Sequence, residues 1–157
     1  MGIDIDIRKH NREAIEKHPM SSRIQMIEGS SISPKIIKQV EEEAKNYKKI
    51  LVCLDSNHTH EHVLGELKAY APLVSVGSYC VVYDTFVEDM PEGSFPDRSW
   101  NKGNNPKTAI WEYLKKHTDF EIDKNIQKNA REIRYNLLEK FCKKKKAKSL
   151  IVAHHQD

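Results

Sequence analysis

Residues 50–58 have the sequence ILVCLDSNH, in which five consecutive apolar residues are followed at once by polar ones. An apolar run of this length is typical of a central strand in a parallel sheet, because helices cover such a strand on both faces. The stretch therefore predicts an α/β domain in which residues 50–54 form a buried strand. Residues 55–58 would then be a loop at the carboxyl end of that strand.

Strand-like and helix-like stretches alternate on both sides of this run. Three further stretches predict strands, because their residues alternate in polarity or run together as apolar residues: residues 2–7, 23–28 and 79–83. Apolar residues at helical spacing predict the helices between them: residues 10–17, 34–44 with Ser33 as N-cap, and 59–71. The last of these helices would bury one face, made of Val63, Leu64, Leu67 and Tyr70.

The remainder of the first 123 residues continues this pattern. Residues 86–106 contain three prolines and two glycines, and they predict a long irregular loop of the kind that is often functional. A helix is predicted at residues 107–117 and a short strand at residues 120–122. The order β-α-β-α-β-α-β-loop-α-β predicts an α/β fold with a largely parallel sheet.

Length and composition exclude several classes of protein. The 157 residues are enough for one domain, and 38% apolar and 31% charged residues with a mean hydropathy of −0.70 indicate a folded, polar chain. No apolar run approaches the ~20 residues of a membrane span, and no secretion signal opens the sequence. Three scattered cysteines predict neither a disulfide framework nor a zinc knuckle. We therefore expect a cytoplasmic protein.

Charge divides the chain into two parts. Residues 1–123 contain 16 Lys and Arg against 20 Asp and Glu, whereas residues 124–148 contain 10 against 2. The first part lacks the basic face that a nucleic-acid-binding domain needs, so no nucleic-acid partner is expected, and the basic tail is interpreted as a solvated face. The tail also carries an apolar stripe at helical spacing: Ile126, Ala130, Ile133, Leu137, Leu138 and Phe141. We divide the chain into an α/β domain, residues 1–123, and a basic helical tail, residues 124–157.

Acidic residues end three of the predicted strands, where ligands of open α/β sheets bind. Asp4 and Asp6 end the first, Asp55 the third and Asp84 the fourth. Asp4 could accept hydrogen bonds from the ribose of a nucleotide cofactor, and Asp55 with Asp84 could hold Mg²⁺ through carboxylate oxygens. His58 could act as a general base. The alternative for each acid is to cap the next helix or to stay solvated.

Two more histidines follow His58 at alternate positions. His58, His60 and His62 are spaced i, i+2 and i+4, and only the first and last of such a set share a helix face. A metal site made of all three is therefore not expected, and exposure to solvent is predicted for them.

Three motifs together resemble the cephalosporin hydroxylase family: DSNHTH at residues 55–60, GSYCVVYDT at 77–85 and GNNPKTA at 103–109. That family includes rhamnosyl O-methyltransferases and has the Rossmann-like fold of S-adenosylmethionine-dependent methyltransferases. The resemblance extends from residue 2 to about residue 123.

The resemblance implies roles for particular residues. GIDID at residues 2–6 is similar to the second strand of the methyltransferase sheet, whose acid holds the cofactor ribose, so Asp4 and Asp6 would bind S-adenosylmethionine. EGSS at residues 28–31 resembles the loop beside the adenine, which assigns Ser30 and Ser31 to the cofactor site. Family members place metal-binding acids at the positions of Asp55, Tyr83 and Asp84.

The sequence departs from the family pattern at three places. By this resemblance it would begin at the second strand, and we expect the first strand and its glycine-rich loop to be lacking. Tyr83 stands where a metal-binding Glu can occur, and the Lys-rich tail after Asp123 replaces the closing strands. These departures suggest a truncated product, with an altered reading frame at its end as one explanation.

The resemblance implies an S-adenosylmethionine-dependent O-methyltransferase that acts on a hydroxyl of a sugar or small metabolite, in lipid or polysaccharide biosynthesis. Asp55 and Asp84 would hold Mg²⁺, His58 would take the proton, and truncation would weaken cofactor binding and turnover. The alternative is a non-catalytic remnant or interaction module that docks through its amphipathic tail, on a partner or on a second copy of the chain.

Overall fold

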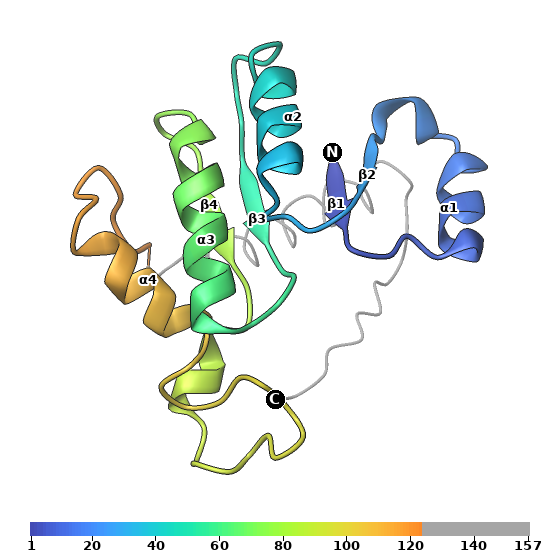
Figure 1. The fold of residues 1–157 in the computed structure, drawn as a ribbon. Coiled ribbons are helices and arrows are strands. Elements are labelled where there is room, and N and C mark those ends of the chain that lie inside the picture. Colours follow the sequence, from blue (N-terminus) through green and yellow to red (C-terminus); the bar gives the residue numbers. More distant parts are fainter. Residues whose placement is uncertain (124–157) are drawn as a thin grey trace, which may run out of the picture. The chain divides into compact units, whose positions relative to one another are not determined.

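The structure, a computed structural model, describes residues 1–123 (Figure 1). Residues 1–118 form one compact unit, and the chain from Asp119 onward belongs to a second unit. Four strands and four α-helices are described, all in the first unit: β1 (Gly2–Asp4), α1 (Lys9–Glu16), β2 (Met26–Glu28), α2 (Pro34–Ala44), β3 (Val52–Leu54), α3 (His60–Tyr70), β4 (Cys80–Val82) and α4 (Pro106–Leu114). Short 3₁₀ helices lie at Ser21–Arg23, Ala71–Leu73 and Thr85–Asp89.

The strands form two separate parallel pairs rather than the single sheet that the sequence predicts. Strand β1 pairs with β2, and β3 pairs with β4, each over three residues. In the first pair Ile3 lies opposite Ile27, and in the second Cys53 lies opposite Val81. The α/β class and the parallel pairing are confirmed, and they are compatible with a Rossmann-like fold. A ladder that joins the two pairs is not present within residues 1–123.

Strand β1 is shorter than its sequence pattern predicts. The backbone N–H of Asp6 donates to Oδ1 of Asp4 at 3.0 Å, which turns the chain directly after Asp4. This local hydrogen bond competes with strand geometry, as Asp side chains often do. Ile5, which would have continued the strand, is 71% exposed.

Strand β3 is covered on one face and not on both. Leu54 is buried, but Leu51 just before the strand is 55% exposed and Cys53 is also exposed. Within the described residues, β3 is therefore not buried on both faces, and that prediction is wrong. A continuously apolar strand is buried on both faces only where neighbouring strands and a helix layer on each side of the sheet cover it.

The helices agree closely with the sequence. Helix α2 begins at Pro34 with Ser33 at the N-cap position, as Pro at the first helical position predicts. Helix α3 buries the predicted face, namely Val63, Leu64, Leu67 and Tyr70. It packs against α4 and β3, and it carries much of the core of the first unit (Figure 1).

The end of the described chain departs from prediction. Residues 120–122 form no strand, since three alternating residues without a neighbouring strand do not specify one. The predicted loop 86–106 begins instead with the 3₁₀ helix Thr85–Asp89. The predicted tail helix and the terminal apolar segment, residues 124–157, lie outside the described residues. No helix within residues 1–123 has the length and apolar character that crossing a membrane requires.

Candidate functional site

Asp55, His58 and Asp84 come together at the carboxyl ends of β3 and β4. Each offers one ligand atom, and these atoms all lie within 4.8 Å of one another. Nε2 of His58 is 3.1 Å from Oδ2 of Asp84, and the His58 side chain is 19% exposed against 39% for Asp84. The parallel pairing of β3 with β4 brings the two ends to one edge, as the sequence predicts. Tyr83, which precedes Asp84, is exposed, and its backbone N–H donates to the Leu54 carbonyl at 3.0 Å.

The backbone at Asp84 has an unusual conformation. Its φ of 54° and ψ of 30° lie in the left-handed region, and Asp84 is the one residue other than glycine with a positive φ among residues 1–123. For a residue with a Cβ this region costs about 1–2 kcal/mol, although Asp and Asn tolerate it better than most. Such strain is often found at functional positions. Here it ends β4 abruptly and directs the Asp84 carboxylate toward His58.

One aromatic residue of the loop that follows β4, Trp100, contacts the imidazole. The His58 and Trp100 rings meet in a T-shaped arrangement, with a centroid distance of 5.4 Å and an interplanar angle of 85°. Phe95 lies 4.7 Å from Trp100, and the Arg98 guanidinium sits 5.7 Å from the centre of the same ring. The sequence analysis missed Trp100, because a lone Trp in a loop gives no local signal of a contact 42 positions away.

The donor set suits a divalent cation. Two carboxylates offer the oxygen ligands that Mg²⁺ and Mn²⁺ prefer, and a neighbouring imidazole is a ligand that Mn²⁺ accepts more readily than Mg²⁺. Asp55 is exposed and makes no hydrogen bond or ion pair within the described residues, so its oxygens are available. The residues present therefore fit a cation with open coordination positions.

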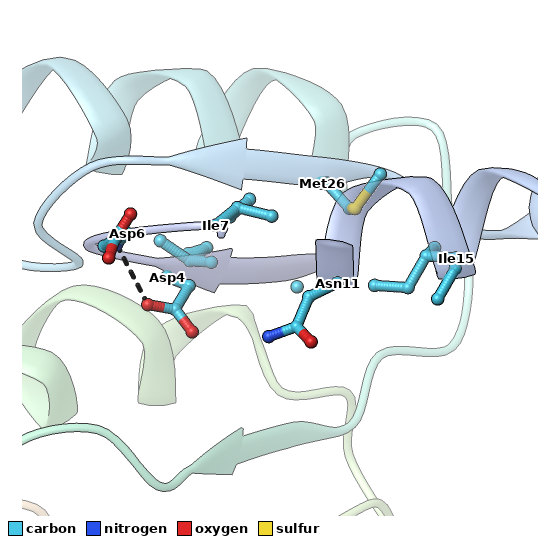
Figure 2. A pocket seen from close by; sticks show the side chains of 9 residues that line it. Asp4, Asp6, Ile7, Asn11, Ile15 and Met26 are labelled. Atoms are coloured by element: carbon cyan, nitrogen blue, oxygen red, sulfur yellow. Dashed lines mark hydrogen bonds between the residues drawn. The ribbon is translucent and has the colours of Figure 1, made fainter. Parts of the chain in front are cut away.

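A separate pocket of about 330 Å³ lies beside β1 and α1 (Figure 2). Asp4 and Asp6 line its polar end, and Asn11 also faces it. Its apolar lining comes from Ile3, Ile7, Ala14, Ile15 and Met26. The two acids that the sequence assigns to the cofactor thus line one pocket, and none of Asp55, His58 and Asp84 lines it.

Ser30 and Ser31 follow β2 and do not line that pocket. Oγ of Ser31 lies 3.0 Å from Nε2 of His62, and the phenol of Tyr70 donates to the Ser31 carbonyl. Ser31 is buried, whereas Ser30 is half-buried. The Ser31 hydroxyl is therefore already engaged by α3.

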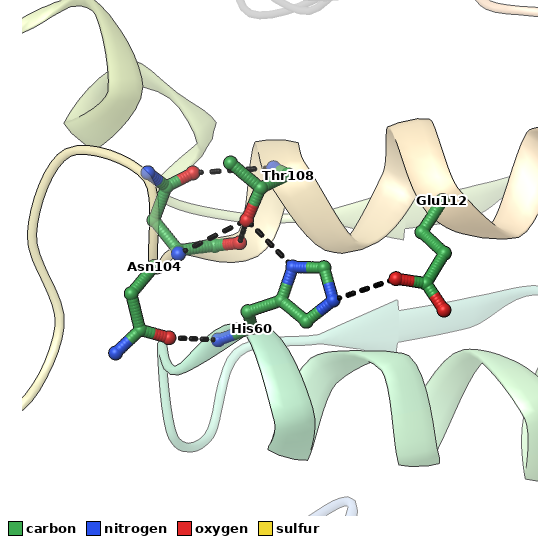
Figure 3. Close-up of polar contacts among 5 residues, drawn as sticks. His60, Asn104, Thr108 and Glu112 are labelled. Atoms are coloured by element: carbon green, nitrogen blue, oxygen red, sulfur yellow. Dashed lines mark hydrogen bonds and ion pairs between the residues drawn. The ribbon is translucent and has the colours of Figure 1, made fainter.

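The three histidines are not solvated as predicted, because each meets a different carboxylate. His58 meets Asp84 at 3.1 Å, and His62 meets Glu66 at 3.6 Å. His60 bridges α3 to α4, with Nδ1 2.8 Å from the Thr108 hydroxyl and Nε2 3.1 Å from Glu112 (Figure 3). Its backbone N–H also donates to the Asn104 side chain. His60 thus ties the GNNPKTA segment to the start of α3, a structural role.

Three groups near these sites have shifted pKa values. Burial raises the pKa of the Cys80 thiol to about 11, with smaller contributions from Cys53 and Glu66. Burial also raises the pKa of Tyr70 to about 12, helped by Glu66 and Glu41. The Gly103 N–H and the Asn105 amide hold the pKa of Glu88 below its usual value. A thiol that stays protonated is a poor nucleophile, so we assign Cys80 no role as a nucleophile.

Fold and site together define the class of protein: an α/β chain whose acids lie at the carboxyl ends of parallel strands, where such proteins bind ligands. The model of the rhamnosyl O-methyltransferase/CmcI family matches residues 1–136, and the chain belongs to that family. The resemblance drawn from the three motifs is thereby confirmed.

Curated relatives carry the same description. The rhamnosyl O-methyltransferase of Mycobacterium tuberculosis strain H37Rv is 41% identical over 66 residues, which is 41% of this chain and 27% of that protein. The rhamnosyl O-methyltransferase of Mycobacterium leprae is 32% identical over 90 residues, or 57% of this chain and 38% of that protein. The chain thus matches less than two fifths of the length of these relatives. No solved structure matches it.

Proposed function

We propose that the protein takes part in S-adenosylmethionine-dependent O-methylation of a sugar hydroxyl, with rhamnose as the favoured acceptor. The observation that carries this proposal is the convergence of Asp55, His58 and Asp84 at the ends of β3 and β4. In a chain of this family, two carboxylates beside an imidazole suit the activation of a hydroxyl. The mycobacterial relatives are named rhamnosyl O-methyltransferases, which supports rhamnose as the sugar.

The cofactor would lie against the end of β1. S-adenosylmethionine supplies an activated methyl group when it is bound. Oδ1 of Asp4 already accepts from the Asp6 N–H, so its second oxygen would accept a hydrogen bond from the ribose. The apolar wall of the neighbouring pocket provides a surface for the less polar parts of the cofactor. Ser30 and the backbone of Ser31 would lie beside the adenine.

Asp55 and Asp84 would hold Mg²⁺, whose charge lowers the pKa of a hydroxyl bound next to it. His58 would take the proton of that hydroxyl. The contact of Nε2 with Asp84 suits the tautomer in which Nε2 carries the hydrogen, and this leaves Nδ1 to accept a proton. Trp100 limits rotation of the imidazole from the side.

The segment 86–106 would cover the acceptor and exclude water. Its aromatic residues Phe86, Phe95 and Trp100 form a chain of ring contacts that ends at His58. Methyl transfer requires the acceptor oxygen in line with the methyl carbon at roughly 3–3.5 Å, so the acceptor has to be held firmly. An aromatic wall next to the base suits this task.

Calorimetric titration of the full chain with S-adenosylmethionine tests the cofactor part of the proposal, and mass spectrometry of a synthetic rhamnoside tests methyl transfer. We expect saturable binding that Asp4→Asn weakens and that Glu16→Gln, on the exposed face of α1, leaves unchanged. Absence of binding at millimolar cofactor would contradict the proposal. That outcome would favour the alternative, an interaction module without catalytic activity.

A further inference from the structure

A polar cluster forms around the buried carboxylate of Glu66, on the core side of α3. Glu66 is only 3% exposed, although it lies on the same helix face as Val63 and Tyr70. Its Oε1 accepts a hydrogen bond from the Ser56 hydroxyl at 2.7 Å. Nε2 of His62 lies 3.6 Å from the same oxygen. A charged residue therefore occupies a position where helical spacing calls for an apolar one.

The cluster reaches the loops that follow two different strands. Ser56 belongs to the loop after β3, directly beside Asp55. His62 contacts Ser31 in the loop after β2, with 3.0 Å between Nε2 and Oγ, and Tyr70 donates to the Ser31 carbonyl. One helix thus anchors both the loop assigned to the cofactor and the loop assigned to the cation.

Asp55 depends on this anchor for its position. Its side chain makes no hydrogen bond or ion pair within residues 1–123, so only the backbone on each side holds it. On the strand side, the Tyr83 N–H donates to the Leu54 carbonyl at 3.0 Å. On the loop side, the first tie is the hydrogen bond from Ser56 to Glu66. Without Glu66, the backbone around Asp55 would be held only on the strand side, by the hydrogen bond between Tyr83 and Leu54.

The second oxygen of Glu66 indicates that stability alone does not explain the residue. Oε2 is buried and has no hydrogen-bond partner among the described residues. A buried polar group without a partner costs about 1–3 kcal/mol, and an apolar residue of similar size would avoid that cost. A residue that is costly for folding yet anchors a functional loop fits a positioning role.

We propose that Glu66 and His62 are positioning residues: Glu66 fixes Asp55 through Ser56, and His62 fixes the loop after β2 through Ser31. The assignment of one loop to the cofactor and the other to the cation rests on the proposed function, whereas the anchoring of the loops by α3 does not. The hydrogen bond of Glu66 with Ser56 and that of His62 with Ser31 hold different loops, so a substitution can break one and leave the other. Substitution of Glu66 should therefore affect the loop after β3, and substitution of His62 the loop after β2.

Hydrogen–deuterium exchange of the metal-free full chain tests the anchoring. Glu66→Leu should raise deuterium uptake at residues 55–59 while the melting temperature stays the same or rises, because an unpartnered buried oxygen is removed. Glu66→Gln keeps an oxygen that can accept from Ser56, so its uptake there should remain close to that of the wild type. His62→Leu should raise uptake at residues 29–33 and not at 55–59. Peptides from α1 serve as the internal control.

A measurement of Mn²⁺ binding then tests whether the hydrogen bond between Ser56 and Glu66 supports the proposed cation site. Ser56→Ala and Glu66→Leu should each weaken binding by about tenfold, as loss of supporting groups around metal ligands commonly does, and the double variant should be no weaker than either. Ser56→Thr keeps the hydroxyl and should restore affinity. Wild-type uptake at residues 55–59 in Glu66→Leu, or a uniform rise across the chain, would overturn the positioning role of Glu66. Wild-type uptake at residues 29–33 in His62→Leu would overturn that of His62. If the wild type binds no Mn²⁺, the proposed cation site fails, and the exchange pattern still decides the anchoring.

Discussion

At the residue scale, Asp84 combines an unusual backbone conformation with a charged side chain at the candidate site. Its positive φ is tolerated because a short carboxylate side chain suits the left-handed region better than most side chains do. The carboxylate meets His58 and is proposed to bind a cation. The backbone requires a residue that tolerates a positive φ, and the proposed site requires a negative charge. Different substitutions can test these two requirements separately.

Replacement of Asp84 by Ala should destabilise the protein by about 1 kcal/mol relative to Asp84→Asn, since alanine lacks the tolerance of Asn for a positive φ. Both variants lose the negative charge, so both should lose the cation. The free energy of unfolding in urea measures the first effect. Equal stability of the two variants would show that the conformation at residue 84 is not strained in solution.

The two described cysteines should differ in reactivity. Cys53 is exposed, whereas burial raises the pKa of Cys80 to about 11 and leaves little thiolate at moderately alkaline pH. We therefore expect iodoacetamide at pH 8.5 to alkylate Cys53 well before Cys80, as followed by peptide mass spectrometry. In urea the two rates should converge. Faster labelling of Cys80 in the folded protein would contradict its burial.

At the element scale, the start of α4 depends on Asn105. The Asn105 side-chain oxygen accepts from the N–H groups of Lys107 and Thr108 at 3.0 and 3.3 Å, and the Thr108 hydroxyl accepts from the Asn105 N–H in return. The amide nitrogen donates to Glu88 and to the Asn101 carbonyl. This capping box joins α4 to the 3₁₀ helix after β4 and holds the end of the loop that carries Trp100.

Asn105→Ala should therefore lower the free energy of unfolding by about 1–2 kcal/mol, the usual cost of losing an N-cap. Asn46→Ala, at an exposed position just after α2, is the matched control and should change it by less than about 0.5 kcal/mol. Thermal and urea unfolding check both values. A similar small effect of the two substitutions would mean that α4 does not rely on its cap.

The helices were predictable from sequence because their signals are local. Pro34 marked the start of α2, and the spacing of Val63, Leu64 and Tyr70 marked the buried face of α3. Strand ends were predicted less well, since burial of β3 depends on neighbours that are distant in sequence. The single hydrogen bond from Asp6 to Asp4 was enough to end β1 early.

The candidate site was predictable only in part. Acids that follow parallel strands were expected to meet at one edge, and Asp55 and Asp84 do so. Glu66 was missed, although a charge at the i+3 position from Val63 on an apolar stripe was a visible signal. Trp100, the partners of His60 and the contact of His62 with Ser31 had no such signal, because these contacts join segments far apart in the chain.

At the scale of the whole molecule, two groups with raised pKa values link stability to alkaline pH. Cys80 and Tyr70 keep their protons in the folded state up to about pH 11 and 12, whereas the unfolded chain releases them near their ordinary values of 9.0 and 10.0. Above pH 9 the unfolded state therefore binds fewer protons than the folded one. The free energy of unfolding must then fall as the pH rises.

We expect the free energy of unfolding to fall by up to about 2 kcal/mol between pH 9 and 10.5, mainly through Cys80. Cys80→Ala should remove most of that fall, and Tyr70→Phe should reduce the further loss between pH 10 and 12. Urea unfolding at several pH values provides the test. An identical pH dependence in Cys80→Ala would exclude the thiol as its origin.

The proposal depends most on the cation site formed by Asp55 and Asp84 beside His58. Equilibrium binding of Mn²⁺, followed by the electron paramagnetic resonance signal of the unbound ion, tests it most directly. We predict one saturable ion per chain, at least about tenfold weaker binding in Asp55→Asn and Asp84→Asn, and unchanged binding in Glu16→Gln, which replaces an exposed acid of α1. Absence of saturable binding, or equal binding by all four proteins, would contradict the proposal.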